Sequence, residues 1–368
     1  MFNKHDKKKN KYMLNGSLKR KGYDWWWHSF TALDEFNNEV PFFFEFYIIN
    51  PKYKNKGLNL GLINHKPCFL MIKFGHWGEN KKELNYFIDL NDTTIKHGKD
   101  FNITAKSCVL SETLSKGAFT IDENSIGFKE KMTDLGSCSW NLEINKEIAW
   151  NVGYGTCDLL REIKAFQMYW HAEGMKTTFS GEIIFDGKKY RVIPDKSYGY
   201  ADKNWGRGFT SPWVWLSSNN LYSNKNNIKY NNSVFDIGGG RPKVYFLPLN
   251  RKLLSGIYIE GKEYEFNFSK FWTHTKTKFN SYEDQEYIYW TVDQSNKEYY
   301  YKSNFKCKKN DMIHIRYIDP TGTVKFHNLW NGGNGTGNIK LYKKNKKSDY
   351  LIDDINCSNV GCEYGEFD

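Results

Sequence analysis

The sequence has no apolar stretch long enough to cross a membrane as a helix. Its most hydrophobic run, PFFFEFYII at 41–49, contains Glu45 and is far shorter than the ~20 residues that a spanning helix needs. The N-terminal residues MFNKHDKKKNKYMLNG carry charge but no apolar segment, so we expect no secretory signal. These absences predict a soluble, cytoplasmic protein.

Paired cysteines and clustered metal ligands are also missing. The seven cysteines are scattered and odd in number, so they predict no disulfide framework and favour a reducing compartment. The nine histidines include no His-x-His pair and no neighbouring Cys-x-x-Cys, which argues against a zinc site. A serine nucleophile lacks support because no Gly-x-Ser-x-Gly element occurs. We therefore expect neither a metal nor a cofactor.

Positive charge is unevenly distributed along the chain. The formal net charge is +11, and residues 1–21 contain eight Lys or Arg against one Asp. The other 347 residues therefore carry only +4. Nucleic-acid binding needs basic residues gathered on one folded face. We interpret residues 1–20 as a flexible basic tail and expect no nucleic-acid partner.

Aromatic residues are abundant, at 17% of the chain, and they favour pleated sheets. Segments such as EYIYWTV (286–292) and MIHIRYI (312–318) alternate as half-buried strands do. Only TCDLLREIKAF (156–166) has a helical pattern. With 368 residues, the chain is long enough for two domains, so we predict an all-β protein with one short helix.

Two segments resemble each other and suggest two successive β units. SGEIIFDGKKYRV (180–192) and SGIYIEGKEYEF (255–266) both read as hairpins with an acidic-Gly turn. The alternative is coincidence between two ordinary hairpins. We place the two domains at 21–205 and 206–368. The glycine-rich segments DIGGGRPK (236–243) and NGGNGTGN (331–338) lack the features of phosphate-binding loops, and we interpret them as wide β-turns.

The segment SYGYADKNWG (197–206) contains the first candidate for chemistry. If 198–204 is extended, Tyr198, Tyr200 and Asp202 share one face with Asn204. This stripe is typical of a cavity lining, although a solvent-exposed strand end is the alternative.

Two further segments place acidic or titratable side chains among aromatic ones. In FQMYWHAEGMK (166–176), His171 and Glu173 share a face with Tyr169, and an ordinary core or rim histidine is the alternative. Glu45 is either a cavity carboxyl with a raised pKa or the outward residue of an edge strand.

Several of these motifs resemble the tocopherol cyclase family. The segments are WHAEGMKT (170–177), YRVIPDKSYGYADKNWG (190–206) and FTSPWVWLSSNNL (209–221), with GYDWWWHSFTA and FDIGGGRPKV typical of the bacterial branch. The likeness extends over most of residues 20–280. It implies an architecture shared with carotenoid hydratases, namely two consecutive lipocalin-like β units, each able to hold one small ligand.

The resemblance implies an acid-catalysed reaction without a cofactor. A carboxylic acid protonates an alkene of a prenylated quinol, and the phenol oxygen closes a chroman ring. This is the activity of an isomerase of the intramolecular lyase type. Asp202 would be the acid, by likeness to the Tyr-x-Asp element of the carotenoid hydratases. Tyr200 and His171 would orient it or accept the phenol proton.

Aromatic and polar residues near these motifs are the candidates for substrate binding. Apolar walls hold an acid protonated, and indole faces stabilise a cation. The binding candidates are Trp26, Glu45, Trp170, Glu173, Trp205, Trp213, Trp215 and Asn219. The partner would be an isoprenoid hydrophobe, taken up through peripheral membrane contact. The alternative function is a non-catalytic lipocalin-like carrier, in which Asp202 would pair with Lys203 or Arg207 at the surface.

Overall fold

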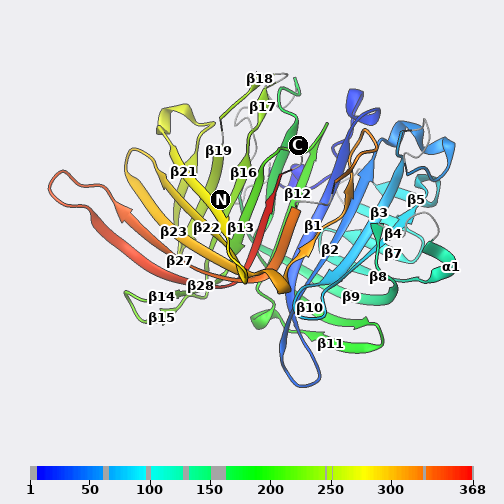
Figure 1. Cartoon of the computed structure of the whole chain (residues 1–368), viewed down its shortest axis with the longest axis horizontal. Coiled ribbons are helices and arrows are strands. Elements are labelled where there is room, and N and C mark those ends of the chain that lie inside the picture. Colours follow the sequence, from blue (N-terminus) through cyan, green and yellow to red (C-terminus); the bar gives the residue numbers. More distant parts are fainter. Residues whose placement is uncertain are drawn as a thin grey trace.

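The computed structural model describes residues 6–60, 66–96, 101–126, 132–150, 163–244, 247–250, 252–325 and 329–366. The chain is all-β and forms two lipocalin-like units, as predicted (Figure 1). The only α-helix in these ranges is the four-residue α1 (Glu123–Ile126). Most of the helix expected at 156–166 lies outside the described residues. Among the described helices, none has the length and apolar character needed to span a bilayer.

The first sheet contains twelve antiparallel strands from the first half of the chain. They are β1 (Tyr23–Leu33), β2 (Glu39–Ile49), β3 (Phe69–His76), β4 (Lys82–Ile88), β5 (Thr93–Lys96), β6 (Asn102–Ala105), β7 (Cys108–Ser111), β8 (Leu114–Ile121), β9 (Gly136–Trp150), β10 (Met168–Phe185), β11 (Lys188–Val192) and β12 (Gly199–Gly206). The order is β4-β3-β2-β1-β11-β10-β9-β8-β7-β6-β5, and β12 pairs with both β1 and β10.

The second sheet also has twelve strands, from the second half. They are β13 (Trp213–Ser218), β14 (Asn220–Ser223), β15 (Ile228–Lys229), β16 (Ser233–Gly240), β19 (Lys252–Ile259), β20 (Lys262–Asn267), β21 (Lys276–Glu283), β22 (Tyr287–Ser295), β23 (Tyr299–Lys308), β24 (Ile313–His314), β27 (Leu329–Lys343) and β28 (Tyr350–Gly365). Its main path is β20-β19-β16-β13-β28-β27-β23-β22-β21. Two ribbons stand apart: β17 (Lys243–Val244) with β18 (Leu247–Pro248), and β25 (Tyr317–Ile318) with β26 (Val324–Lys325).

The first sheet curls around an aromatic interior. Phe30 on β1 packs against Phe179 on β10, with ring centroids 4.9 Å apart, and Phe74 on β3 packs against Trp140 on β9 at 4.8 Å. We call the side of β1, β10 and β12 that faces this interior the barrel face. Buried aromatic side chains, among them Phe30, Phe74, Trp140 and Phe179, line this interior.

The opposite side of the same strands faces the second sheet, and we call it the junction face. The two sheets lie side by side in Figure 1, with β1 and β12 near the middle of the view. The first sheet ends at Gly206 and the second begins at Trp213. Trp213, Trp215 and Val234 belong to the same hydrophobic cluster as the first unit, so the core of the first unit extends across the junction. The second unit also has a separate hydrophobic cluster, which includes Phe235 and Trp290.

The N-terminal segment is not a flexible tail over its described part. Residues 6–19 form two 3₁₀ turns, Asp6–Lys9 and Gly16–Lys19, and the side chains of Leu14 and Leu18 are buried. The Trp26 indole donates a hydrogen bond to the Asn10 carbonyl at 2.6 Å. The expectation was wrong because apolar residues between the lysines pack against the first unit.

Both predicted hairpins are present, but they are not equivalent parts of two repeats. Asp186-Gly187 and Glu260-Gly261 have positive φ at both turn positions, as a two-residue turn of this twist requires. The β10–β11 hairpin lies beside β1, in the interior of its sheet's order, whereas β19–β20 ends its sheet. The sequence likeness therefore reflects common turn chemistry.

The glycine-rich segments are strands, not the turns that we predicted. Residues 236–240 belong to β16, and 331–338 belong to β27. A Cβ on Gly238 would lie 2.7 Å from the Trp170 ring, and one on Gly333 would lie 2.2 Å from the Trp77 ring. A side chain at either position would clash, because indoles from the first unit occupy that space.

Candidate active site

Asp202 lies on the junction face, in the middle of β12. Its side chain is 7% exposed. The Trp170 indole donates a hydrogen bond to its Oδ2 at 2.9 Å, and the Tyr200 hydroxyl lies 3.2 Å from the same atom. Its Oδ1 is buried and has no hydrogen-bond partner among the described residues. One oxygen of the carboxyl is thus held in place, and the other is left for a further interaction.

A second buried carboxyl, Asp236 on β16, faces Asp202 from the second sheet. The Tyr200 hydroxyl lies 3.1 Å from Asp236 Oδ2, and the Trp215 indole donates to Asp236 Oδ1 at 3.2 Å. Tyr200 therefore bridges two carboxyls from different sheets. Sequence reasoning missed Asp236 because its glycine-rich neighbours suggested a turn. The signal that could have revealed it is alternation, since VFDIG places Asp236 on the opposite strand face from Phe235 and Ile237.

The geometry of this bridge accommodates a bound proton. A tyrosine hydroxyl has one proton to donate, yet the Tyr200 oxygen is within hydrogen-bond distance of both carboxyls. When one carboxyl is protonated and donates to the tyrosine oxygen, each contact has its own proton. When both carboxyls are ionised, they must share the single hydroxyl proton. Asp202, Tyr200 and Asp236 therefore form a connected acidic unit whose geometry suits a bound carboxyl proton.

Electrostatics favour the same state. Burial raises the pKa of Asp202 well above its usual range, and the hydrogen bond from Trp170 only partly offsets this effect. The nearby Glu363 and Glu173 carboxylates raise it further. Burial likewise raises the pKa of Asp236 and that of Tyr200. Burial removes the water that would solvate the charged forms, so it favours the protonated forms.

A narrow hollow opens beside this acidic unit. Its cavity volume is about 20 Å³, which is room for about one water molecule. Tyr200 and Trp215 line it together with Asn219, whose amide donates to the Gly199 carbonyl at 2.8 Å. The other lining residues come from both units: Ser29, Phe30, Thr31, Pro41, Trp77, Met175, Tyr198, Ser217, Ser218, Gly333, Asn359 and Gly361.

The structure brings together six of the predicted site residues at the junction face. Trp213 meets Trp170 edge-on, with ring centroids 6.1 Å apart, and Trp215 packs against Tyr200 at 4.9 Å. The six are Trp170, Tyr200, Asp202, Trp213, Trp215 and Asn219. They come from both units, so the site forms only when the two units pack together.

His171 does not reach Asp202, contrary to our expectation. His171 pairs across the strands with Lys203, which is adjacent to Asp202 in β12. Successive residues of a strand point to opposite faces, so His171 lies on the barrel face and Asp202 on the junction face. Trp205 is on the barrel face too, where it stacks on Tyr169 at 5.5 Å. The predicted roles of His171 and Trp205 beside the acid are therefore not supported.

Glu173 and Trp26 also belong to the barrel interior. Glu173 forms an ion pair with Lys146 at 3.0 Å, and burial raises the pKa of Glu173 to about 7. Trp26 stacks on Phe101 at 5.0 Å, and the Lys203 ammonium lies 3.7 Å from its ring centre. Sequence alternation correctly separated the two faces of each strand, but it could not show which face meets the second sheet.

Glu45 on β2 is a buried carboxyl of the junction face, not the outward residue of an edge strand. The Tyr317 hydroxyl donates to it at 3.0 Å, and Lys73 lies 3.9 Å away. Burial raises the pKa of Glu45 to about 8, despite the opposing effect of Lys73. Glu45 is therefore a buried carboxyl with a raised pKa, which agrees with the first of the two interpretations. Its side chain faces the second unit, however, and not a barrel lumen.

In a non-catalytic carrier, Asp202 was expected to pair with Lys203 or Arg207 at the surface. In the structure it forms an ion pair with neither. Lys203 pairs with Asp24 on the barrel face, and Arg207 donates to the Lys164 and Phe166 carbonyls. Within the described ranges, no cluster of three or more His, Cys, Asp or Glu could hold a metal ion. What the site offers is a pair of buried carboxyls that accept hydrogen bonds from indole rings.

Comparisons with known proteins agree with the sequence motifs. The family model described as Tocopherol cyclase-like matches residues 72–366. The curated proteins include no match. A solved structure of kievitone hydratase from Nectria haematococca has a TM-score of 0.45 and 9% identity, covering 96% of this chain and 94% of its own. A protein of Nitrosomonas europaea assigned to AttH has a TM-score of 0.46 and 8% identity, with 92% and 93% coverage. Both structural likenesses are too distant to bear on function. The family match covers most of the chain, and the protein belongs to the tocopherol cyclase-like family.

Proposed function

We propose that the protein is a cofactor-independent intramolecular cyclase acting on a prenylated quinol or a related isoprenoid, with Asp202 as the general acid. Asp202 gives its proton to one alkene carbon, and a tertiary cation forms at the other. The phenol oxygen then bonds to that cation and releases its own proton. The product is an isomer of the substrate, so the reaction needs no oxidant or reductant.

The observation that carries the proposal is the bridged pair of buried carboxyls. An acid that protonates an alkene must keep its proton at neutral pH, and burial without a basic partner achieves this. The unpartnered Oδ1 of Asp202 is the oxygen from which a proton could be delivered. Tyr200, which also contacts Asp236, holds Oδ2 of Asp202 in position while the proton leaves.

Indole and phenol rings next to the acid suit a cationic intermediate. Trp170 and Trp215 each donate from the ring edge to one of the two carboxyls, and Trp213 and Tyr200 pack against them. An aromatic face stabilises a cation by about 0.5–2 kcal/mol. The same rings exclude water, which would otherwise capture the cation and give a hydration product.

Turnover in D₂O tests the reaction class. The substrate is trimethylhydroquinone bearing a short prenyl chain, and the product is analysed by mass spectrometry and NMR after exchangeable protons are returned to ¹H. Cyclisation predicts one deuterium on carbon and an otherwise unchanged mass. A product heavier by one water would establish a hydratase, and an unchanged substrate that nevertheless binds tightly would favour a carrier.

A further inference from the structure

Positive charge is concentrated at one end of the molecule, which we call the basic end. Here β1 begins beside the ends of β2 and β12, and β13 begins beside the end of β16. The segments that adjoin these strand ends in the sequence are 7–21, 50–60, 207–212 and 241–252. Together they contain fifteen Lys or Arg and no Asp or Glu. An opposite charge on a partner would therefore be attracted to this end.

Acidic residues also occur at the basic end, but their carboxylates have other contacts. Asp89 and Asp319 each accept a hydrogen bond from a backbone amide of their own turn at 2.8 Å. Asp92 and Glu112 form ion pairs with lysines at 2.9 and 3.3 Å. The basic side chains at 19–21, in contrast, are exposed to solvent. The acids therefore neutralise only part of the positive charge.

The basic N-terminal segment is attached to the folded body. The Met13 amide donates to the Asp24 carboxylate at 2.6 Å, and the Lys164 ammonium donates to the Asn15 carbonyl at 2.9 Å. These contacts keep the neighbouring lysines at the basic end. Like charges held together repel each other, and an anionic partner would relieve this repulsion.

Exposed apolar side chains of the second unit lie at the same end. Leu247 in β18 is 60% exposed, and Trp272 in the 3₁₀ turn Phe271–Thr273 is 53% exposed. The β17–β18 ribbon precedes β19, and Trp272 follows the end of β20 that pairs with the beginning of β19. Figure 1 shows β17 and β18 at the upper edge of the molecule. The end thus combines basic and apolar groups.

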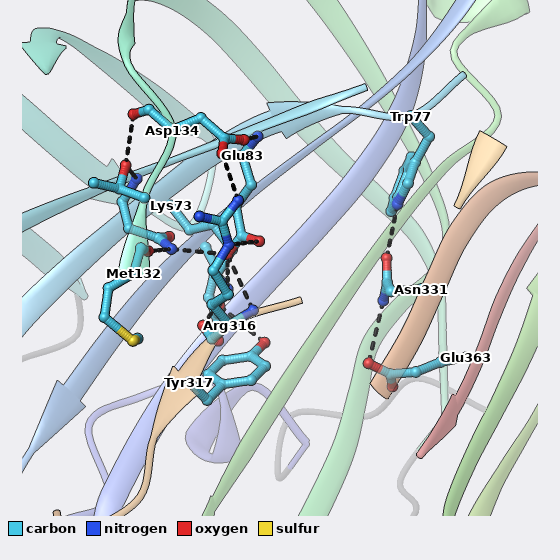
Figure 2. Close-up of polar contacts among 12 residues, drawn as sticks. Lys73, Trp77, Glu83, Met132, Asp134, Arg316, Tyr317, Asn331 and Glu363 are labelled. Carbon is cyan, nitrogen blue, oxygen red and sulfur yellow. Dashed lines mark hydrogen bonds and ion pairs between the residues drawn. The ribbon is translucent and has the colours of Figure 1, made fainter. Parts of the chain in front are cut away.

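Buried polar contacts hold the two units, and so the two parts of this end, together. Figure 2 shows Arg316 of the second unit paired with Asp134 of the first at 2.7 Å. It also shows the Trp77 indole donating to Asn331 at 2.9 Å. Lys73 donates to the Arg316 carbonyl at 2.9 Å. The basic segments and the apolar side chains therefore keep a fixed relation, as docking on one extended surface requires.

We propose that the basic end docks on an anionic lipid membrane, with exposed lysines at the headgroups and with Leu247 and Trp272 inserted between them. Basic residues are attracted to an anionic leaflet, apolar side chains add to binding at the interface, and tryptophan is enriched there. A nucleic acid would match the charge, but single strands bind by stacking bases on aromatic rings, which gives Leu247 no role. The inference does not depend on the reaction proposed above.

The opposite end of β1 provides a matched control. The loop DEFNN (34–38) between β1 and β2 contains two acids and no base, and its Phe36 is 76% exposed. Lys188 and Lys189 lie in the β10–β11 hairpin, away from the basic end, and are exposed. Changes at these positions alter exposed apolar area or net charge without touching the proposed surface.

Sedimentation with vesicles of equal parts phosphatidylglycerol and phosphatidylcholine tests the proposal without any substrate. Wild type should bind these vesicles, bind pure phosphatidylcholine vesicles far less, and lose most binding between about 0.1 M and about 0.5 M NaCl, because salt screens exposed charges. Lys19→Glu combined with Lys21→Glu should weaken binding about 20-fold or more, since each basic residue near the surface contributes about fivefold. Lys188→Glu combined with Lys189→Glu changes the net charge equally and should bind nearly as wild type does.

Leu247→Ser tests the apolar contribution, and it should weaken binding about fivefold because a buried leucine side chain is lost from the interface. Phe36→Ser should bind as wild type does. Thermal unfolding verifies that each variant is folded, and the comparison of Leu247→Ser with Phe36→Ser decides the matter if the Lys19 and Lys21 variant is not.

Three results would overturn the proposal. The first is a wild-type protein that does not sediment with the anionic vesicles. The second is an equal effect of the two lysine pairs, which would mean that net charge and not this end determines binding. The third is tighter binding to a DNA duplex than to the vesicles at the same salt concentration, with Leu247→Ser behaving as wild type, which would identify a nucleic acid as the partner.

Discussion

At the residue scale, the proposed chemistry depends on three side chains that are linked by hydrogen bonds. Tyr200 stands between Asp202 and Asp236, and each carboxyl has a separate indole donor, Trp170 or Trp215. Because the three groups interact, their protons are bound by the set and not by one residue. Replacing any one of them should alter the titration of the others.

Tyr200→Phe should lower kcat about 100-fold and destabilise the protein by about 1–3 kcal/mol. The change removes the hydroxyl that both buried carboxyls contact, and each is left short of a hydrogen-bond partner. The packing of the ring against Trp215 is retained. Steady-state kinetics and urea unfolding measure the two effects, and a variant with wild-type kcat would show that the bridge is not part of the acid.

Asp236→Asn should retain turnover but shift its pH dependence. The proposed acid must be protonated, so the rate should fall as pH rises through the apparent pKa of the carboxyl pair. Removal of a neighbouring like charge lowers the pKa of the remaining carboxyl by ~1 unit or more. The alkaline decline of kcat should therefore move to lower pH. A profile identical to that of wild type would mean that Asp236 does not interact with the acid.

At the scale of elements, the site depends on glycine-rich strands that let indoles approach the backbone. Gly238 on β16 leaves room for the Trp170 ring, so the second sheet comes close enough for Asp236 to reach Tyr200. Sequence reasoning interpreted these glycines as turns because glycine commonly marks turns. Only the packing of a distant indole shows why a strand needs them here.

Gly238→Ala should destabilise the protein by about 1–3 kcal/mol and reduce activity. The new methyl group would lie 2.7 Å from Trp170, and overpacking of this kind forces side chains out of position. Gly208→Ala is the matched control, since a methyl group at that position would meet no described atom within 4 Å. The unfolding temperature and kcat should be lower for Gly238→Ala than for Gly208→Ala. Equal values for the two variants would show that neither stability nor activity needs the close approach of Trp170 to β16.

Alternation along the strands made part of this site predictable. It placed Tyr200 and Asp202 on one face and Lys203 on the other, as the structure shows. It could not assign the faces to the barrel or the junction, because that depends on how the second unit packs. His171 was therefore placed beside the acid, although it lies on the opposite face.

At the scale of the whole molecule, buried carboxyls make stability depend on pH. Burial raises the pKa of Glu45 to about 8 and that of Glu363 to about 7, from about 4.3 in unfolded chains. Above pH 4.3 the unfolded chain has lost these protons while the folded protein still holds them. The stability that these carboxyls contribute should therefore be full below about pH 4.3 and fall as pH rises toward 8.

Urea unfolding between pH 5 and pH 8 measures this effect, and the midpoint should decrease over the interval. Glu45→Gln should make the dependence shallower, because a neutral amide replaces the group that must hold a proton. Glu182→Gln, at an exposed position, should leave the slope unchanged. A midpoint that rises between pH 5 and pH 8 would contradict the assignment of buried protonated carboxyls.

The most direct test of the central claim, that Asp202 is the general acid, is the paired measurement of turnover and binding in Asp202→Asn. Asn is close to Asp in size and can still accept from Trp170, so tryptophan-fluorescence titration with a prenylated hydroquinone should give a dissociation constant within about twofold of wild type. Asn has no carboxyl proton to give, and general acid catalysis contributes about 10²–10⁴-fold, so product formation should fall by at least that factor. If Asp202→Asn binds and converts the substrate as wild type does, Asp202 is not the acid.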